Sequence, residues 1–272
     1  MPELIGAARA ADGHPPFSDR ALVDLRTGAK QLVTIDDVAA AIVSDTEAEL
    51  VVHPDARRRG YGTELVETVL TDAAPGLLAW AHGDGAAARA LAERFGFEPV
   101  RRLLLLTAQV PDASPAPRGA APAGVTIRAF RPERDADAWV ALNARAFAAH
   151  PEQGRVTRAD LAELEAEPWF DASAFLLAWR GRTLVGYCWL KLGDDDGEIY
   201  VLGVAPEEQG AGLGRALLAA GLDELARRGI RSSSLYVEAD NAVALALYER
   251  AGFRETSADV QYRWRPGARI GA

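Results

Sequence analysis

The chain has 272 residues, 49% of them hydrophobic and 25% charged, a composition typical of a globular protein long enough for two domains with separate cores. A formal net charge of −9 argues against nucleic acid or an anionic membrane surface as the main partner. The single cysteine, Cys188, excludes an intramolecular disulfide and a cysteine-rich zinc site. No apolar run approaches the roughly 18 residues of a membrane helix, and we expect a cytoplasmic protein.

The first half of the chain alternates short apolar runs with helical patterns. A helix is expected over 22–26, a second begins after Gly62, and a third over 86–94 ends at Gly96, because glycine readily adopts the left-handed turn that closes a helix. Strands are expected over 31–35, 39–43, 50–52, 77–80 and 100–106.

A change of composition separates the two halves. Residues 107–124 are rich in Pro, Ala, Ser and Gly and lack the apolar residues needed to build a core. We therefore expect an N-terminal domain over 1–110, a semi-rigid Pro/Ala-rich linker over 111–124 and a C-terminal domain over 125–272.

The second half repeats the alternation of strands and helices. The run Asp194-Asp195-Asp196-Gly197 is expected to be a solvated turn, because three adjacent carboxylates point in different directions and do not form a metal site. Helices are expected over 135–147, 159–167, 241–250 and from 213 to the stop signal Gly229, and strands over 125–130, 175–179, 183–192, 198–204, 234–238 and 260–264.

The stretch from Leu202 to Arg215 joins an apolar strand to a helix through a glycine-rich bend with the pattern Gln-x-x-Gly-x-Gly. The first backbone N–H groups of such a helix have no partner within the helix, the helix dipole adds partial positive charge, and glycine lets an anion approach closely. The bend lacks the Lys-Ser/Thr of nucleotide hydrolases and the third glycine of dinucleotide-binding folds. It predicts either a phosphate-binding loop or an ordinary strand-to-helix turn.

The pattern occurs twice, which favours the phosphate-binding interpretation. Four landmarks recur with an offset of 152 positions: Leu50 and Leu202, Pro54 and Pro206, Gly60 and Gly212, Gly62 and Gly214. A second motif, Glu-Arg-Phe-Gly-Phe at 93–97 and Glu-Arg-Ala-Gly-Phe at 249–253, recurs with an offset of 156. Repetition at this scale predicts two copies of one α/β fold, each a mixed central β-sheet flanked by helices.

The spacing of these bends resembles the pyrophosphate-binding loop of the GCN5-related N-acetyltransferases (GNAT), which hold acetyl-CoA. Acetyl transfer from a thioester to an amine requires a base for the amine proton, stabilisation of the carbonyl oxygen and a proton for the departing thiolate. Glu198 is a candidate base, Tyr236 or Tyr248 a candidate acid, and backbone N–H groups near Val204 would polarise the carbonyl. The alternatives are an exposed acid at Glu198 and core packing for either tyrosine.

Longer segments resemble one branch of that superfamily, the mycothiol synthase family of actinobacterial tandem acetyltransferases. The segments are 143–154, 168–171, 197–204 and 235–241 in the second half, with 49–62 and 79–83 in the first. The resemblance implies a tandem repeat of two GNAT domains, of which the C-terminal one is catalytic and the N-terminal one binds acetyl-CoA without turnover. The implied reaction acetylates the cysteinyl amine of cysteinyl-glucosaminyl-inositol, a thiol-containing pseudo-disaccharide, with acetyl-CoA as co-substrate and no metal.

The resemblance also implies site residues. Glu198 matches the general base of the family and Tyr236 its general acid. The substrate-binding positions are Asp19, Glu152, Lys191, Glu198 and Tyr236. The acetyl-CoA positions in the C-terminal half are Leu202, Gly203, Val204, Gln209, Gly210, Ala211, Gly212, Leu213, Gly214, Arg215, Asn241, Ala242, Val243, Ala244, Leu245 and Ala246. Those in the N-terminal half are Leu50, Val51, Val52, Arg58, Arg59, Gly60, Tyr61, Gly62 and Thr63.

The chain departs from the family pattern at several of these positions. Gly210 and Ala211 stand where the family loop carries arginines, so attraction for phosphate comes more from the backbone, and Asp19 has a shorter reach than the usual Glu. In the N-terminal half, carboxylates precede the bend, but Trp80 and His82 occur where the second copy has Tyr236. We therefore expect one copy to perform chemistry and the other to bind cofactor or act as a scaffold.

Two other functions remain open. One is a tandem acetyltransferase for a different small amine, such as an amino sugar or a peptide N-terminus. The other is an acetyl-CoA-binding regulator without turnover, against which the presence of both Glu198 and Tyr236 counts. Cys188 is expected to pack rather than act as a nucleophile, and Trp169 and Phe170 either wall the substrate cleft or pack in the core. We expect a monomer that binds neither nucleic acid nor membrane.

Overall fold

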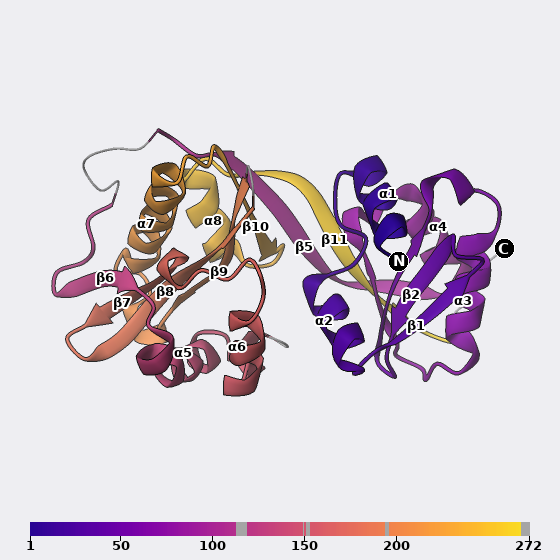
Figure 1. The fold of residues 1–272 in the computed structure, drawn as a ribbon, viewed down its shortest axis with the longest axis horizontal. Helices are drawn as coiled ribbons and strands as arrows, with labels where there is room; N and C mark the ends of the chain where they lie inside the picture. The colour runs from indigo at the N-terminus through magenta and orange to yellow at the C-terminus, as the bar shows by residue number, and fades with distance from the viewer. Residues whose placement is uncertain (113–118, 149, 151–152, 194–195, 268–272) are drawn as a thin grey trace. The chain divides into compact units, whose positions relative to one another are not determined.

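The computed structural model describes residues 1–112, 119–148, 150, 153–193 and 196–267. The chain divides into two compact units, each with β-strands on which helices pack (Figure 1). Unit 1 contains Met1–Leu104, Glu238–Asp240 and the chain from Ser257, and unit 2 contains Leu105–Val237 and Asn241–Thr256. No helix within the described part of the chain is long and apolar enough to cross a membrane.

Unit 1 opens with two helices, α1 (Pro2–Asp12) and α2 (Asp19–Thr27), followed by three antiparallel strands, β1 (Gln31–Ile35), β2 (Ala39–Val43) and β3 (Glu47–Val52). The short turn η1 (Pro54–Ala56) and helix α3 (Tyr61–Thr71) lead to β4 (Leu78–Ala81), which lies parallel to β3. The turn η2 (His82–Asp84), helix α4 (Ala86–Phe95) and the first part of β5 (Phe97–Gln109) follow.

Unit 2 contains β6 (Val125–Ala129) and two helices, α5 (Pro132–Ala146) and α6 (Arg158–Glu165), with the short turn η3 (Gln153–Arg155) between them. Three antiparallel strands follow, β7 (Phe175–Arg180) after η4 (Ala172–Ala174), β8 (Thr183–Leu192) and β9 (Asp196–Val204). The turn η5 (Pro206–Glu208) and helix α7 (Leu213–Arg227) lead to β10 (Ser232–Glu238), which lies parallel to β9, and α8 (Ala242–Arg250) precedes the last strand, β11 (Arg254–Trp264).

Each unit is completed by a strand from the other half of the sequence. The expected last strand of the C-terminal domain lies in unit 1 from Ser257 onward, where Val260 stands opposite Ala81 and Arg263 opposite Leu78. In turn, β5 belongs to unit 2 from Leu105 onward and lies next to β10. The units therefore differ from the boundaries expected at 110 and 125, because backbone pairing in a sheet is not confined to one half of the chain.

Some expected features differ or cannot be described. The sequence analysis does not predict α1, a short alanine-rich helix whose Leu4 and Ala8 are buried in one cluster with Phe17. Its stability therefore comes from tertiary packing rather than from its own pattern. Residues 113–118 of the expected linker and Asp194 and Asp195 of the expected turn lie outside the described residues.

The core of unit 2 lies between the sheet and helices α5 and α6. Trp139 of α5 is fully buried, and its ring centroid lies 5.6 Å from those of Phe175 and Tyr187 and 5.7 Å from that of Trp189. Arg128 holds the start of α5 by donating hydrogen bonds of 2.6 and 2.9 Å to Asp135. This face of the sheet carries the side chains of Tyr187 and Trp189 of β8.

Helix α7 covers the opposite face of the same sheet. Gly221 of α7 approaches so closely that an added Cβ would lie 2.9 Å from the Cys188 sulfur and 3.5 Å from Ile199. Burial raises the pKa of the Cys188 thiol to about 12. The expectation that Cys188 packs in the core agrees with these observations. Figure 1 shows α5 and α6 on one side of these strands and α7 on the other.

The buried aromatic cluster makes Trp139 a test of this core. Trp139→Ala should lower the free energy of unfolding by about 3–5 kcal/mol, because the neighbouring rings cannot collapse into the space that the indole leaves. Urea titration followed by circular dichroism measures this difference. Asp137→Ala, an exposed position on the same helix, should change the free energy by less than about 0.5 kcal/mol. Equal effects at the two positions would contradict the assignment.

Candidate active site and cofactor cavity

The strands β9 and β10 diverge inside unit 2. Their parallel pairing runs from Ser232 opposite Asp196 to Ser234 opposite Glu198 and ends there. Beyond this point the facing edges of the two strands present backbone N–H and C=O groups that can bind a ligand. Glu198 therefore lies where the sheet opens.

A β-bulge adjusts the same strand. Leu190 stands opposite Ile199 and Trp189 opposite Val201, so that Tyr200 is an extra residue on β9. Bulges of this kind bend a strand and increase its twist, and they often lie next to active sites. The bulge here immediately follows Glu198, at the point where β9 leaves β10.

Three of the predicted site residues share one face of this sheet. Lys191 on β8 stands opposite Glu198 on β9, and side chains that are directly opposite in an antiparallel pair lie on the same face. Tyr236 lies two residues after Ser234, the partner of Glu198, and therefore on that face as well. Because Ile199 faces α7, this is the face covered by α5 and α6.

The two candidate acids lie in different surroundings. Tyr236 is 38% exposed on β10. Tyr248 on α8 is 7% exposed, packs against Phe253 with a ring separation of 6.0 Å, and has its pKa raised by burial. Tyr248 is therefore a core residue.

The glycine-rich bend after β9 forms the start of α7. Gly210 and Gly212 have φ angles of 77° and 85°, which only glycine adopts without strain, and Gly212 is the N-cap of the helix without a side-chain cap. The first N–H groups of α7 thus form an anion-binding end without a competing side chain. At Gly214 an added Cβ would lie 3.6 Å from Leu247 of α8 and 3.7 Å from Val204, so α7, α8 and the end of β9 converge there.

Two acidic residues in this bend are neutralised by arginines. Arg180 donates two hydrogen bonds of 2.8 Å to Glu208, and Arg145 donates one of 2.9 Å to Glu207. The hydrogen bond from Arg180 holds the pKa of Glu208 below its usual value. The remaining predicted segment, Asn241 to Ala246, forms the start of α8, where the Asn241 side chain accepts a hydrogen bond of 3.1 Å from the Ala244 N–H.

The predicted substrate residues are only partly brought together. Glu152 lies outside the described residues, and Asp19 is the first residue of α2 in unit 1, whereas Lys191, Glu198 and Tyr236 belong to unit 2. Next to Glu152 in the chain, the backbone oxygen of Gln153 accepts a hydrogen bond of 2.6 Å from the fully buried Asn143. The Tyr187 hydroxyl donates one of 2.6 Å to the same asparagine.

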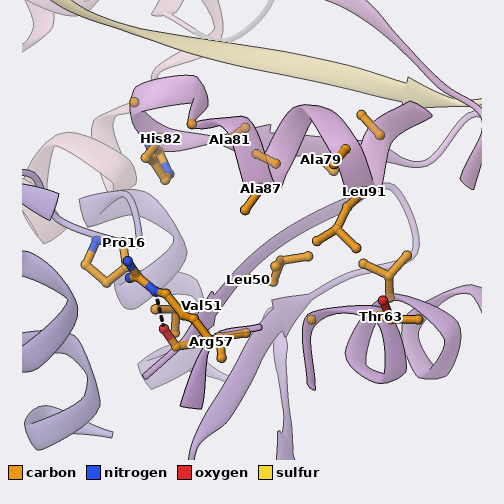
Figure 2. A pocket seen from close by; sticks show the side chains of 18 of the residues that line it. Pro16, Leu50, Val51, Arg57, Thr63, Ala79, Ala81, His82, Ala87 and Leu91 are labelled. Carbon is orange, nitrogen blue, oxygen red and sulfur yellow. Dashed lines mark hydrogen bonds between the residues drawn. The ribbon is translucent and has the colours of Figure 1, made fainter. Parts of the chain in front are cut away.

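Unit 1 contains a cavity of about 720 Å³ between β3, α3, β4 and α4 (Figure 2). In the figure, the side chains of Leu50 and Thr63 face those of Ala87 and Leu91 across the space. Of the predicted cofactor residues, Leu50, Val51, Val52, Arg58, Gly60, Gly62 and Thr63 line the cavity, whereas Arg59 and Tyr61 do not.

Glycines shape the end of this cavity beside the start of α3. Gly60, the N-cap of α3, has a φ of 96°, and an added Cβ at Gly62 would lie 3.3 Å from Leu91. Arg58 has a φ of 64°, which is unusual for a residue with a side chain. The combination of a helix start, close glycines and an arginine loop fits a pyrophosphate.

Sequence reasoning missed several residues of the cavity. Asp12 of α1 accepts two hydrogen bonds of 2.7 Å from Arg57, and Phe97 and Tyr262 line the wall. Of these three residues, only Phe97 could have been found from the sequence, because it belongs to the repeated Gly-Phe motif. Asp12 and Tyr262 reach the cavity through α1 and β11, whose positions only the tertiary structure determines.

A buried charged cluster stands at the end of this cavity. His82 contacts Glu49 through Nε2 at 3.0 Å and Asp259 through Nδ1 at 2.9 Å. Burial alone would lower the pKa of His82, but the bonds to the two carboxylates outweigh it and raise this pKa to about 10. Burial raises the pKa of Glu49, whereas His82 and two hydrogen bonds from Ser18 outweigh it and hold this pKa below 4.5.

Glu47 stands in unit 1 at the register position of Glu198. Glu47 pairs with Leu78 as Glu198 pairs with Ser234. Leu78 and Ser234 are equivalent, because they are 156 positions apart, the offset of the second repeated motif. The Glu47 carboxylate accepts a hydrogen bond of 2.6 Å from the Lys30 ammonium and one of 3.1 Å from the Trp80 indole. The side chain of Lys30 is only 7% exposed, so the Glu47 carboxylate is paired with an internal cation.

The comparisons with known proteins agree with the two-copy geometry. Residues 139–253 match the model of the acetyltransferase (GNAT) family, and residues 26–99 match that of an acetyltransferase (GNAT) domain. A mycothiol acetyltransferase of Clavibacter sepedonicus is 49% identical, with 96% of this chain and 90% of that protein aligned, and one of Geodermatophilus obscurus is 45% identical over 96% and 92%.

Solved structures resemble the chain over nearly its whole length. A GCN5-related N-acetyltransferase of Sphaerobacter thermophilus has a TM-score of 0.70 at 28% identity, covering 98% of this chain and 93% of that one. A tandem GNAT protein from the clavulanic acid biosynthesis pathway has a TM-score of 0.68 at 20% identity, covering 96% and 94%, and shares the fold.

The cluster around His82 predicts a pH-dependent stability. Because the pKa of His82 is raised from 6.5 to about 10, its stabilising effect is fully present below pH 6.5 and is lost as the pH rises through 10. His82→Gln should lower the free energy of unfolding by about 2–5 kcal/mol at pH 6, because two buried carboxylates lose their cation. Urea titrations at several pH values measure the difference from the wild type, which should shrink between pH 6.5 and 10.

Ser18→Ala is the matched control, because it removes a neutral partner of Glu49. It should cost about 1 kcal/mol, with no pH dependence in that range. A His82→Gln difference that stays constant from pH 6.5 to 10 would show that His82 is neutral in the folded protein.

Proposed function

Because this chain belongs to the mycothiol acetyltransferases, a family of tandem GNAT proteins, we propose that it transfers the acetyl group of acetyl-CoA to the cysteinyl amine of cysteinyl-glucosaminyl-inositol. The products are mycothiol and CoA, which makes this the last step of mycothiol biosynthesis. The C-terminal domain performs the reaction, and the N-terminal domain binds acetyl-CoA without turnover.

The observation that carries the proposal is the placement of Glu198 and Tyr236 on one face, where β9 and β10 diverge. Lys191 stands opposite Glu198 on the same face, and the glycine-rich start of α7 follows the end of β9. A base for the amine proton and an acid for the departing thiolate are groups that acetyl transfer needs, the helix end suits the phosphates of acetyl-CoA, and the lysine suits a polar acceptor.

Each residue has a stated role in the reaction. Glu198 accepts the proton of the amine, directly or through a water, as the amine nitrogen forms a bond to the thioester carbon. Backbone N–H groups near Val204 stabilise the carbonyl oxygen as it gains charge. Tyr236 donates a proton to the sulfur as the carbon–sulfur bond breaks. The burial of Tyr248 supports Tyr236 in this role.

Acetyl-CoA is proposed to lie along the end of β9, the bend from Gln209 to Arg215 and the start of α8. A second molecule is proposed for the cavity of unit 1, whose arginine loop and helix start suit a pyrophosphate. The ion pair between Lys30 and Glu47 supports the absence of turnover there, because the carboxylate already holds a cation. No metal takes part in the proposed chemistry.

The remaining proposals concern partners and location. The acceptor is a small thiol-containing pseudo-disaccharide, and the protein acts as a cytoplasmic monomer that binds neither nucleic acid nor membrane. The acidic net charge and the single buried cysteine support these proposals.

The first test is a thiol-release assay on the wild type and Glu198→Gln. The acceptors are cysteinyl-glucosaminyl-inositol, glucosamine and a cysteine peptide; acceptor thiol is subtracted, and product is identified by mass. We expect strong preference for the pseudo-disaccharide, and kcat/KM should fall about 10²–10⁴-fold in Glu198→Gln, because the amine proton loses its acceptor.

Glu163→Gln, an exposed carboxylate on α6, is the control and should leave kcat/KM unchanged. Equal use of glucosamine would favour a general amine acetyltransferase. Acetyl-CoA binding with no turnover of any acceptor would favour a regulator.

Substitutions at two equivalent glycines test the two proposed acetyl-CoA sites separately. Gly212→Val and Gly60→Val each place a branched side chain at a helix N-cap whose backbone is in the left-handed region. Gly212→Val should raise the KM for acetyl-CoA at least about tenfold, because a distortion of only 1–2 kcal/mol weakens binding by that factor. Gly60→Val should leave turnover intact and reduce the acetyl-CoA stoichiometry in calorimetry from two to one. Loss of turnover in Gly60→Val alone would assign the chemistry to unit 1.

A further inference from the structure

We propose that Trp169 is a positioning residue for the acceptor, because its indole face holds the Lys191 ammonium on the catalytic face of the sheet. This inference rests on the proposed function and extends it to a residue outside the acid, base and substrate set. Trp169 lies in the loop between α6 and η4, and the sequence left open whether it lines the cleft or packs in the core.

The indole packs against the core and also contacts Lys191. The Lys191 Nζ lies 5.3 Å from the ring centroid, within the range of a cation–π interaction. The centroid of the same ring lies 5.0 Å from that of Tyr200 and 5.8 Å from that of Trp189, with interplanar angles of 55° and 45°. Trp169 is therefore held by aromatic contacts to both strands, and it presents its face to the lysine.

These contacts tie the indole to the catalytic geometry. Tyr200 is the bulged residue of β9, two positions after Glu198, and Trp189 lies two positions before Lys191 on β8. Trp169 thus bridges the strand that carries the base and the strand that carries the cation. A shift of the indole would move the ammonium relative to the Glu198 carboxylate opposite it.

Lysine is rare in this chain. Lys30 and Lys191 are the two lysines, and arginine supplies the other 28 of the 30 basic residues. Each lysine lies beside the glutamate at the equivalent register position of its unit: Lys30 contacts Glu47, and Lys191 is opposite Glu198. A compact ammonium with three rotatable donors suits a polar acceptor better than a flat guanidinium fork, but its four-carbon stem needs an external constraint. The indole supplies that constraint.

The kinetic test compares Trp169→Leu, Trp169→Phe, Lys191→Met and the double variant Trp169→Leu/Lys191→Met. Trp169→Leu should raise the KM for the pseudo-disaccharide about tenfold, with kcat changed less than about twofold and the KM for acetyl-CoA unchanged. Trp169→Phe, which keeps an aromatic face, should show a smaller increase. In the Lys191→Met background, Trp169→Leu should have no further effect, because the indole acts through the lysine.

Phe170→Leu is the matched control. Phe170 packs on Trp189 with a ring separation of 5.9 Å, next to Trp169 in the chain, so its loss perturbs the same aromatic cluster. It should leave the KM for the acceptor unchanged. An equal increase in Phe170→Leu, or an undiminished effect of Trp169→Leu in the Lys191→Met background, would reduce Trp169 to a packing residue.

A second measurement needs no acceptor, and it separates this inference from the proposed function. Reductive methylation with ¹³C-formaldehyde labels the lysines and the N-terminal amine, and Lys191→Arg assigns the Lys191 resonance. A dimethylammonium above an indole face should resonate upfield, and this shift should disappear in Trp169→Leu and persist in Phe170→Leu. If the pseudo-disaccharide is not acetylated but the shift is present, the substrate assignment fails and the contact stands. If the shift is absent from the wild type, the positioning role is wrong whatever the substrate.

Discussion

The early divergence of two parallel strands is the constraint on which the rest of this molecule depends. In unit 2, β9 and β10 pair over only three residues, and in unit 1, β3 and β4 pair from Glu47 opposite Leu78 to Glu49 opposite Trp80. A sheet that opens in this way exposes backbone hydrogen-bonding groups inside the protein, and these groups are stabilised when a ligand pairs with them. The glycine-rich bend at the end of the first strand then directs a helix N-terminus toward the same opening.

The two copies use this common frame in different ways. In unit 2 the carboxylate at the divergence, Glu198, shares its face with Tyr236, and an aromatic cluster holds Lys191 opposite it. In unit 1 the equivalent carboxylate, Glu47, is already paired with Lys30, and His82 of a buried charged cluster lines the cavity. The two copies thus share the frame and differ in the cations that the fold places beside the equivalent carboxylate.

Much of the fold followed from sequence patterns, and the prediction of two GNAT domains is confirmed by the family matches and the solved structures. Helix starts and stops were predictable because the glycine bends and the glycine C-caps are local signals. Helix α1 and the assignment of β11 to unit 1 were not predictable. The first is stabilised by burial of Leu4 and Ala8 and the second by backbone pairing with β4, and neither leaves a local pattern in the sequence.

The sequence by itself determined that the chain contains two copies of one α/β fold, because the glycine bends recur at a fixed offset and Gly60 and Gly212 adopt a left-handed backbone that favours glycine. The resemblance of these bends to a known family indicated an acetyltransferase. The sequence also pointed to Glu198 as a base, because the spacing between this residue and the bend lies within one strand and can be read along the chain. Only the tertiary structure showed that Tyr236 is exposed and Tyr248 buried, joined Trp169 to Lys191 and brought Asp259 to His82. Exposure, ring contacts and ion pairs between distant segments depend on strand register and helix packing, which arise from the whole chain at once.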